Sequence, residues 1–110
     1  IELIPDTVLF HYGAATFETG RRDLIALIAD WRTGFPDLEF TVEDLLAEEE
    51  LVAVRLTYRG THLGPWRNLE PTGRRIEVDE MMFFRFDDGV LAEMWELDDH
   101  PRRTRQLTEA

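Results

Sequence analysis

The chain has 110 residues, 12 basic and 23 acidic side chains, and a formal net charge of −11. This length suits one domain with a hydrophobic core, and the acidic balance argues against binding to nucleic-acid backbones or anionic membrane surfaces. The chain contains no Cys, Lys or Ser, which excludes thiolate nucleophiles, Schiff-base lysines, serine triads and disulfides. If the protein is an enzyme, we therefore expect acid–base chemistry by carboxylates or imidazoles. No signal peptide or membrane span is visible, so we expect a cytoplasmic protein.

The first third of the chain predicts a strand followed by a helix. Residues 7–12 have strand composition and end at Gly13. Thr19 can cap a helix in which apolar residues recur at helical spacing until a Gly and a Pro stop it. We expect this helix to span Gly20 to Thr33 and to bury three apolar side chains against a sheet: Leu24, Ile28 and Trp31.

The middle of the chain predicts two more strands and a long loop. Apolar and polar residues alternate at the start of segment 38–46, which indicates a strand. The acidic run 48–50 is interpreted as a solvated turn because adjacent like charges avoid burial. Residues 51–61 predict another strand with one apolar and one polar face. A loop rich in Gly and Pro follows over residues 60–73, and residues 101–110 predict a short helix or a tail.

Residues 76–99 predict a long β-hairpin around Asp88-Gly89, a residue pair that tight hairpin turns favour. Side chains alternate along a strand, so each arm presents an apolar face that also carries a carboxylate. These faces hold Ile76, Val78, Glu80, Met82 and Phe84 in the first arm, and Ala92, Met94 and Glu96 in the second. A carboxylate among apolar side chains lies either at the edge of the sheet in contact with water or in a pocket where it has a functional role. Glu80 and Glu96 are therefore the most informative residues of the chain.

The predicted order is one strand, one helix and four further strands. A curved antiparallel sheet of at least four strands, folded over the helix, is the natural α+β solution for this order. No internal repeat, low-complexity tract or linker is visible, so we expect a single domain over residues 1–110. Arg55, Thr57 and Arg59 lie opposite the apolar face of their strand, so that side must meet water or another subunit.

Several short motifs, taken together in their order and spacing, are similar to those of a known family. They are Phe35-Pro36-Asp37-Leu38, Gly60-Thr61-His62-Leu63-Gly64, Pro71-Thr72-Gly73-Arg74-Arg75, Phe84-Arg85-Phe86-Asp87-Asp88-Gly89 and Glu93-Met94-Trp95-Glu96. The chain resembles the SnoaL-like polyketide cyclases over residues 6–107. This resemblance implies a cone-shaped α+β barrel of the nuclear transport factor 2 superfamily, with a deep apolar pocket and usually a homodimer. It also implies ring closure by an intramolecular aldol reaction without metal or organic cofactor, with the acid/base carboxylate at the position of Glu96.

The chain departs from that family pattern in three places. The acid/base position, usually Asp, is Glu96 here, which is one methylene longer. A His that assists in some cyclases aligns with Met82, which counts against the aldol mechanism. The family fold normally begins with a helix of about five turns that caps the barrel, and no residues before Ile1 supply this helix. We therefore expect that Ile1 is not the true start or that another element closes the pocket.

The residues expected to act in the pocket come from both halves of the chain. Glu96 is the first candidate for catalysis, and its alternative is a rim carboxylate in water or an ion-pair partner of an Arg. His11 is the second candidate, because the resemblance implies a cavity-facing His there; its alternative is a hydrogen-bonded His at a strand end. Candidate substrate-binding residues are Tyr12, His62, Trp66, Met82, Phe84 and Trp95. His62 is also interpreted as a loop-fixing residue, and Asp98 and Asp99 as structural caps.

Two classes of function remain open from the sequence. The first is a cofactor-independent enzyme of the cyclase or isomerase kind acting on an apolar, polyketide-like small molecule; an epoxide hydrolase or dehydratase is a variant of it. The second is a non-catalytic module of the same fold that binds a hydrophobic ligand or dimerises. We expect no metal, because the spacing of the three His matches no ligand motif. We also expect no nucleic-acid or membrane partner and a homodimer formed through the outer face of the sheet.

Overall fold

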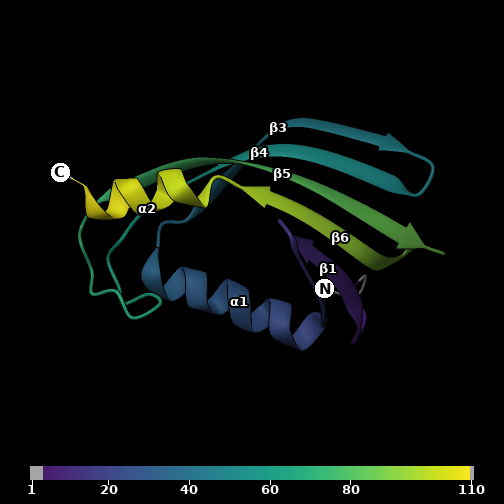
Figure 1. The fold of residues 1–110 in the computed structure, drawn as a ribbon, viewed down its shortest axis with the longest axis horizontal. Coiled ribbons are helices and arrows are strands. Elements are labelled where there is room, and N and C mark those ends of the chain that lie inside the picture. The colour runs from purple at the N-terminus through teal and green to yellow at the C-terminus, as the bar shows by residue number, and fades with distance from the viewer. Residues whose placement is uncertain (1–3, 110) are drawn as a thin grey trace.

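The computed structural model describes residues 4–109, which form one curved sheet of six strands and two helices (Figure 1). The elements are β1 (Val8–Tyr12), β2 (Ala15–Thr19), α1 (Arg21–Gly34), β3 (Glu39–Glu48), β4 (Leu51–Thr61), β5 (Arg75–Asp87), β6 (Val90–Asp98) and α2 (His100–Thr108). Helix α1 lies against one face of the sheet, here called the inner face, and α2 lies at the end of β6 (Figure 1). Within this range, neither helix is long and apolar enough to cross a membrane.

The predicted hairpin of residues 76–99 is confirmed as β5 and β6. Asp88 and Gly89 at its turn both have positive φ angles, 52° and 81°, which is the geometry that tight hairpin turns need. The register pairs Met82 with Glu96 and Glu80 with Asp98, so these four side chains share the inner face.

The strand order is β2-β1-β6-β5-β4-β3, and most neighbours are antiparallel. Strand β1 is the exception, because it runs parallel to β6. The α+β sheet folded over a helix is therefore confirmed, but a wholly antiparallel sheet is wrong. Strand β2 was not expected, since four of its five side chains are exposed and give no alternating pattern. Within residues 4–109 the sheet stays open, with β2 and β3 at its edges.

The expected helix over residues 20–33 is found as α1, shifted by one residue. Leu24 is buried, as predicted, whereas Trp31 is only half-buried and Ile28 is 58% exposed. The apolar stripe of α1 is wider than the surface that the sheet offers to it, which leaves Ile28 in solvent. The predicted cap is also wrong: the N-cap residue is Gly20, which makes no side-chain cap, and not Thr19.

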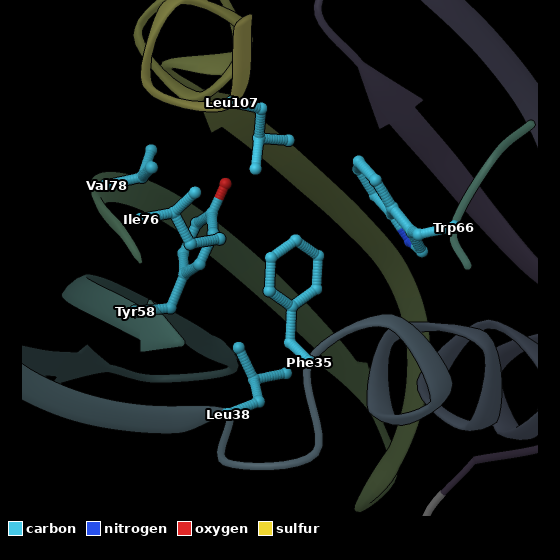
Figure 2. Close-up of a cluster of buried hydrophobic side chains, with 7 residues drawn as sticks. All are labelled: Phe35, Leu38, Tyr58, Trp66, Ile76, Val78 and Leu107. Carbon is cyan, nitrogen blue, oxygen red and sulfur yellow. The ribbon is translucent and has the colours of Figure 1, made fainter. Parts of the chain in front are cut away.

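Two groups of buried side chains hold the fold together. The first joins the loop after α1, β4, β5 and α2, and consists of Phe35, Leu38, Tyr58, Trp66, Ile76, Val78 and Leu107 (Figure 2). The second lies between α1 and the β1–β6 half of the sheet, and consists of Val8, Phe10, Leu24, Leu91 and Met94. Trp31 packs against the first group, whereas Leu24 belongs to the second. Helix α1 therefore spans both groups along the inner face.

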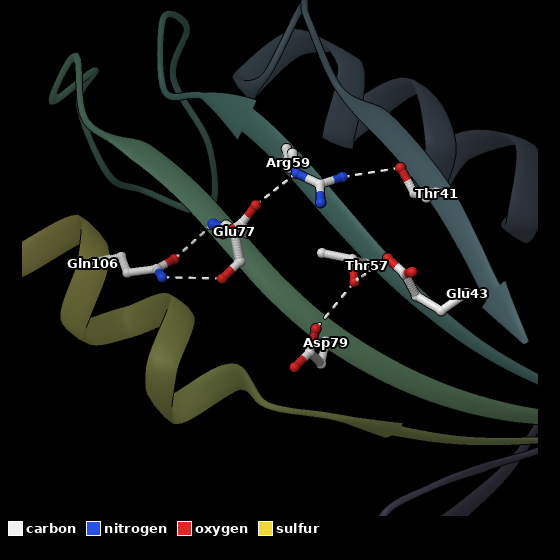
Figure 3. Close-up of polar contacts among 7 residues, drawn as sticks. All are labelled: Thr41, Glu43, Thr57, Arg59, Glu77, Asp79 and Gln106. Atoms are coloured by element: carbon white, nitrogen blue, oxygen red, sulfur yellow. Dashed lines mark hydrogen bonds and ion pairs between the residues drawn. The ribbon is translucent and has the colours of Figure 1, made fainter.

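The opposite, outer face of β3, β4 and β5 carries a polar network (Figure 3). Arg59 donates to Glu77 at 2.6 Å and to Thr41 at 2.9 Å, while the Thr57 hydroxyl donates to Asp79 at 3.0 Å. Gln106 of α2 completes the network by bonding the backbone N–H and carbonyl of Glu77. These contacts cross three strands and attach α2 to β5, although exposed ion pairs of this kind contribute only about 0–1 kcal/mol each.

Candidate active site

A cavity of about 360 Å³ opens between α1 and the inner face of the sheet. Its lining combines apolar side chains with five charged ones, and it includes Phe10 and Leu24 of the second core group and Trp31, which packs against the first. The lining residues are Phe10, Tyr12, Phe17, Thr19, Asp23, Leu24, Leu27, Trp31, Arg67, Glu96, Asp98 and Arg103. This volume lies in the range of sites that hold small molecules, about 300–1,000 Å³.

Three carboxyl groups meet at the end of β5 and β6, at one wall of this cavity. Oxygen atoms of Glu80, Glu96 and Asp98 lie within 4.8 Å of one another. They come together because alternation and the hairpin register put all three on the inner face. Glu96 and Asp98 line the cavity, whereas Glu80 lies beneath them with 7% of its surface exposed.

The surroundings of Glu80 keep its carboxyl group protonated. Burial is the largest cause that raises its pKa well above the ordinary range, followed by a hydrogen-bonding interaction with Glu96 and the negative charges of Glu96 and Asp98. Arg103 opposes this shift but does not outweigh it. A protonated Glu80 can donate a hydrogen bond to its neighbours and adds no negative charge to the cluster.

Asp98 accepts hydrogen bonds from three directions. Its Oδ1 accepts from the Tyr58 hydroxyl at 2.8 Å, and its Oδ2 accepts from the Tyr12 hydroxyl at 3.3 Å and from Nη1 of Arg103. Nη1 of Arg103 also donates to the Tyr58 oxygen at 2.7 Å. Burial disfavours the charge on Arg103, but Tyr58 and Asp98 together raise its pKa. The two charged side chains form a buried ion pair, 6% and 3% exposed.

Aromatic rings hold the Arg103 guanidinium from its other sides. It lies 5.2 Å from the ring centroid of Trp31 and 5.4 Å from that of Trp66, while Arg67 stacks on Trp66 at 4.4 Å. Trp66 can reach this place because the residue it packs on is Gly34: a Cβ there would lie 2.6 Å from the Trp66 Cβ. Trp66 is therefore a buried support behind the cavity and does not line it.

The expectation that His11 reaches the cavity is wrong. Alternation along β1 places Phe10 and Tyr12 in the cavity, so His11 lies on the outer face. There its Nε2 lies 2.6 Å from Oε2 of Glu93, and its ring stacks on Trp95 with centroids 5.0 Å apart. The hydrogen bond to His11 is the largest cause that lowers the pKa of Glu93. Trp95, expected near the substrate, shares this outer face and lines a second groove there with His11; Glu96 borders this groove as well as the cavity.

The other predicted site residues divide between the cavity and the core. Tyr12 and Glu96 line the cavity as expected. Met82 and Phe84 instead pack against the second core group and are not part of the lining. His62 is fully buried, stacks on Phe35 and has Nδ1 3.0 Å from the Thr72 hydroxyl, which fits its loop-fixing interpretation. The catalytic and binding roles of Glu96 and Tyr12 stay predictions.

The buried ion pair of the site, Asp98 and Arg103, was not predicted from the sequence. Asp98 was interpreted as a cap, but the cap of α2 is Asp99, which accepts from the Arg102 N–H at 3.2 Å. The signal for Asp98 was present, since it lies two residues after Glu96 on the same strand and must share its face. Arg103 carried no such signal, because its segment is polar and only the packing of α2 on the sheet buries it.

Replacing Glu80 by Gln should change how stability depends on pH. The folded protein keeps the Glu80 proton that the unfolded chain releases above its ordinary pKa of 4.5. Wild-type stability should therefore fall relative to Glu80→Gln as pH rises above about 5, by at most about 1.4 kcal/mol per pH unit. Urea unfolding of both proteins between about pH 5 and pH 8 measures this difference. Glu70→Gln, at an exposed position, is the matched control, and curves parallel to wild type for Glu80→Gln would contradict the assignment.

Comparisons with known proteins agree with this geometry. Three solved structures have a similar fold. AclR, a candidate hydroxylase from Streptomyces galilaeus, is 29% identical with a TM-score of 0.80, and the match covers 96% of this chain and 66% of AclR. A candidate SnoaL-like polyketide cyclase from Jannaschia sp. CCS1 is 25% identical with a TM-score of 0.86, covering 99% of this chain and 76% of that one, and IdmH, a candidate polyketide cyclase from Streptomyces antibioticus, is 30% identical with a TM-score of 0.79, covering 96% and 82%. A search of curated proteins found no match. The model of the SnoaL-like polyketide cyclase family matches residues 2–107, so this chain belongs to that family.

Proposed function

We propose that this protein is a cofactor-independent enzyme of the cyclase or isomerase kind, acting on an apolar, polyketide-like small molecule. The observation that carries the proposal is the position of Glu96, on the wall of a largely apolar cavity and beside the protonated Glu80. Family membership and the likeness to proteins described as candidate polyketide cyclases support the substrate class. The cavity volume of about 360 Å³ suits a ligand of a few fused rings.

The carboxylate cluster supports Glu96 as the group that moves the proton. Asp98 is held by Arg103 and two tyrosines, and Glu80 is protonated, so Glu96 is the member of the cluster left to act as a base. Its carboxylate would take a proton from the carbon next to a substrate carbonyl. The C–H electron pair becomes a C=C bond, and the carbonyl π pair moves to the oxygen, which gives an enolate.

Ring closure then needs no further reactant. The enolate carbon attacks a second carbonyl of the same molecule, a C–C bond forms, and the π pair of that carbonyl becomes an alkoxide. The alkoxide takes the proton back from Glu96, which restores the carboxylate. An isomerase would use the same first step and return the proton to a different carbon.

A hydrolase or dehydratase is the second candidate. The chain has only one Asn and one Gln, so Asp, Arg and Tyr would have to position a water. Those residue types do gather at the cavity, as Tyr12, Asp98 and Arg103. In this alternative Asp98 would be the base, and Glu96 would be dispensable for proton removal from carbon.

We propose further that the protein is a homodimer formed through the outer face of the sheet. Large apolar side chains there are exposed around a groove: Met81 at 56%, Phe83 at 50% and Leu97 at 67%. An unpaired apolar surface of this kind is typical of an interface. Phe83→Asp should convert the dimer to a monomer in light scattering at micromolar concentration, whereas Phe40→Asp, exposed on the inner side of edge strand β3, should not. A monomeric wild type would contradict the proposal.

Replacing Glu96 by Gln keeps the shape of the side chain and removes its basicity. A test that needs no natural substrate is hydrogen–deuterium exchange at the α-carbon of an apolar bicyclic ketone such as 2-tetralone, followed by NMR. Wild type should accelerate this exchange, and Glu96→Gln should lower the rate by about 10²-fold or more with ketone affinity nearly unchanged. Glu93→Gln, on the same strand but on the outer face, is the matched control and should behave as wild type. If Glu96→Gln accelerates the exchange as much as wild type does, Glu96 is not the base.

A further inference from the structure

Two hydrogen-bond donors, Tyr12 and Arg103, lie at the cavity wall next to the base proposed above. Tyr12 pairs with Glu96 across β1 and β6, and both side chains line the cavity together with Arg103. We propose that Tyr12 and Arg103 bind the substrate oxygen on which negative charge develops when Glu96 removes the proton. This inference rests on the proposed function and adds the groups that stabilise the enolate, together with the charge state of the substrate.

Arg103 retains donors that the protein does not use. A guanidinium has five N–H groups in a planar fork, and both hydrogen bonds that Arg103 makes within residues 4–109 come from Nη1. Within the described residues, the buried polar atoms that lack a hydrogen-bond partner belong to His62 and Trp66. Nε and Nη2 of Arg103 are not among them, so these two nitrogens keep some contact with solvent. Arg103 is 5% exposed and is one of the residues that line the cavity. The remaining donors are therefore available to a ligand.

The two tyrosines that bond Asp98 differ in how tightly they are held. The Tyr58 hydroxyl lies 2.8 Å from Asp98 and 2.7 Å from Nη1 of Arg103, and Tyr58 is only 3% exposed, as part of the first core group. The Tyr12 hydroxyl lies 3.3 Å from Asp98, long for an O–H···O bond, whose usual length is about 2.7–2.8 Å. Tyr12 also lines the cavity and Tyr58 does not. Tyr58 therefore positions Arg103, whereas the Tyr12 hydroxyl makes only a long bond to Asp98 and can turn from it towards a substrate oxygen.

The charges around the cavity indicate an uncharged substrate. Asp98 is neutralised by Arg103, while Glu96 and the exposed Asp23 add negative charge to the lining, and Arg67 is held over Trp66. A permanent carboxylate on the substrate would be repelled by the negative charge of Glu96. A neutral ketone or ester would not, and proton removal would then move that one charge from Glu96 to an oxygen beside Tyr12 and Arg103. Stabilisation of this kind acts on the transition state and not on the bound substrate.

The test compares ligands that differ only in the oxygen. 2-Naphthol resembles a conjugated enol, naphthalene has the same rings without oxygen, and 2-naphthoate carries a permanent charge. Calorimetric or fluorescence titration should show that wild type binds 2-naphthol about tenfold more tightly than naphthalene, and 2-naphthoate more weakly than 2-naphthol. Tyr12→Phe and Arg103→Lys should each lower the affinity for 2-naphthol about fivefold or more, with the affinity for naphthalene unchanged. Arg102→Lys, exposed on the same helix, is the matched control.

Three results would overturn the inference. They are a wild type with no preference for 2-naphthol over naphthalene, variants that keep the wild-type preference, and variants that lose affinity for both ligands equally. If circular dichroism shows that Arg103→Lys does not fold, Tyr12→Phe alone decides. The titrations use no turnover, so they fail independently of the proposed function: loss of deuterium exchange in Glu96→Gln tests the base, and ligand preference tests the oxygen-binding donors.

Discussion

The buried ion pair between Asp98 and Arg103 joins the elements that build the cavity. It ties the last residue of β6 to the first turn of α2, and it holds the Tyr58 hydroxyl of β4 between the two charges. Removing one partner of a buried pair leaves an uncompensated charge and costs about 3–5 kcal/mol. The rings of Trp31 and Trp66 cover the guanidinium, so the same contact also fixes α1 and the long loop against the sheet.

This ion pair also determines what the neighbouring acids can do. Because Arg103 is committed to Asp98, little positive charge is left for Glu80, and burial keeps that carboxyl protonated. The antiparallel register of the hairpin puts Glu96 on the same face as this neutral acid, and Glu96 lines the open cavity. One network thus provides a neutral acid, a carboxylate held in place by hydrogen bonds and a carboxylate that lines the cavity, which is the division of roles that the proposed acid–base chemistry needs.

The sequence predicted the parts that depend on local pattern. Alternation and the Asp88-Gly89 turn were enough to place Glu80 and Glu96 on one face of a hairpin. The expectation for His11 came from the family resemblance and was wrong: residues on both sides of β1 are apolar or aromatic, so only the pairing with β6 decides which face is inner. The burial of Arg103 could not be predicted either, because the residues that contact it come from β4, β6, α1 and the loop before β5, and no local sequence pattern links them.

The division of roles in the cluster depends most on one glutamic acid that stays protonated at neutral pH. Carbon-13 NMR of the glutamate side-chain carboxyls, recorded as a pH titration, observes this state directly. We expect one carboxyl signal in wild type that is still in its protonated position at about pH 7 and is missing from the spectrum of Glu80→Gln. A wild type in which every glutamate carboxyl has ionised by about pH 6, or a protonated signal that persists in Glu80→Gln, would contradict this expectation.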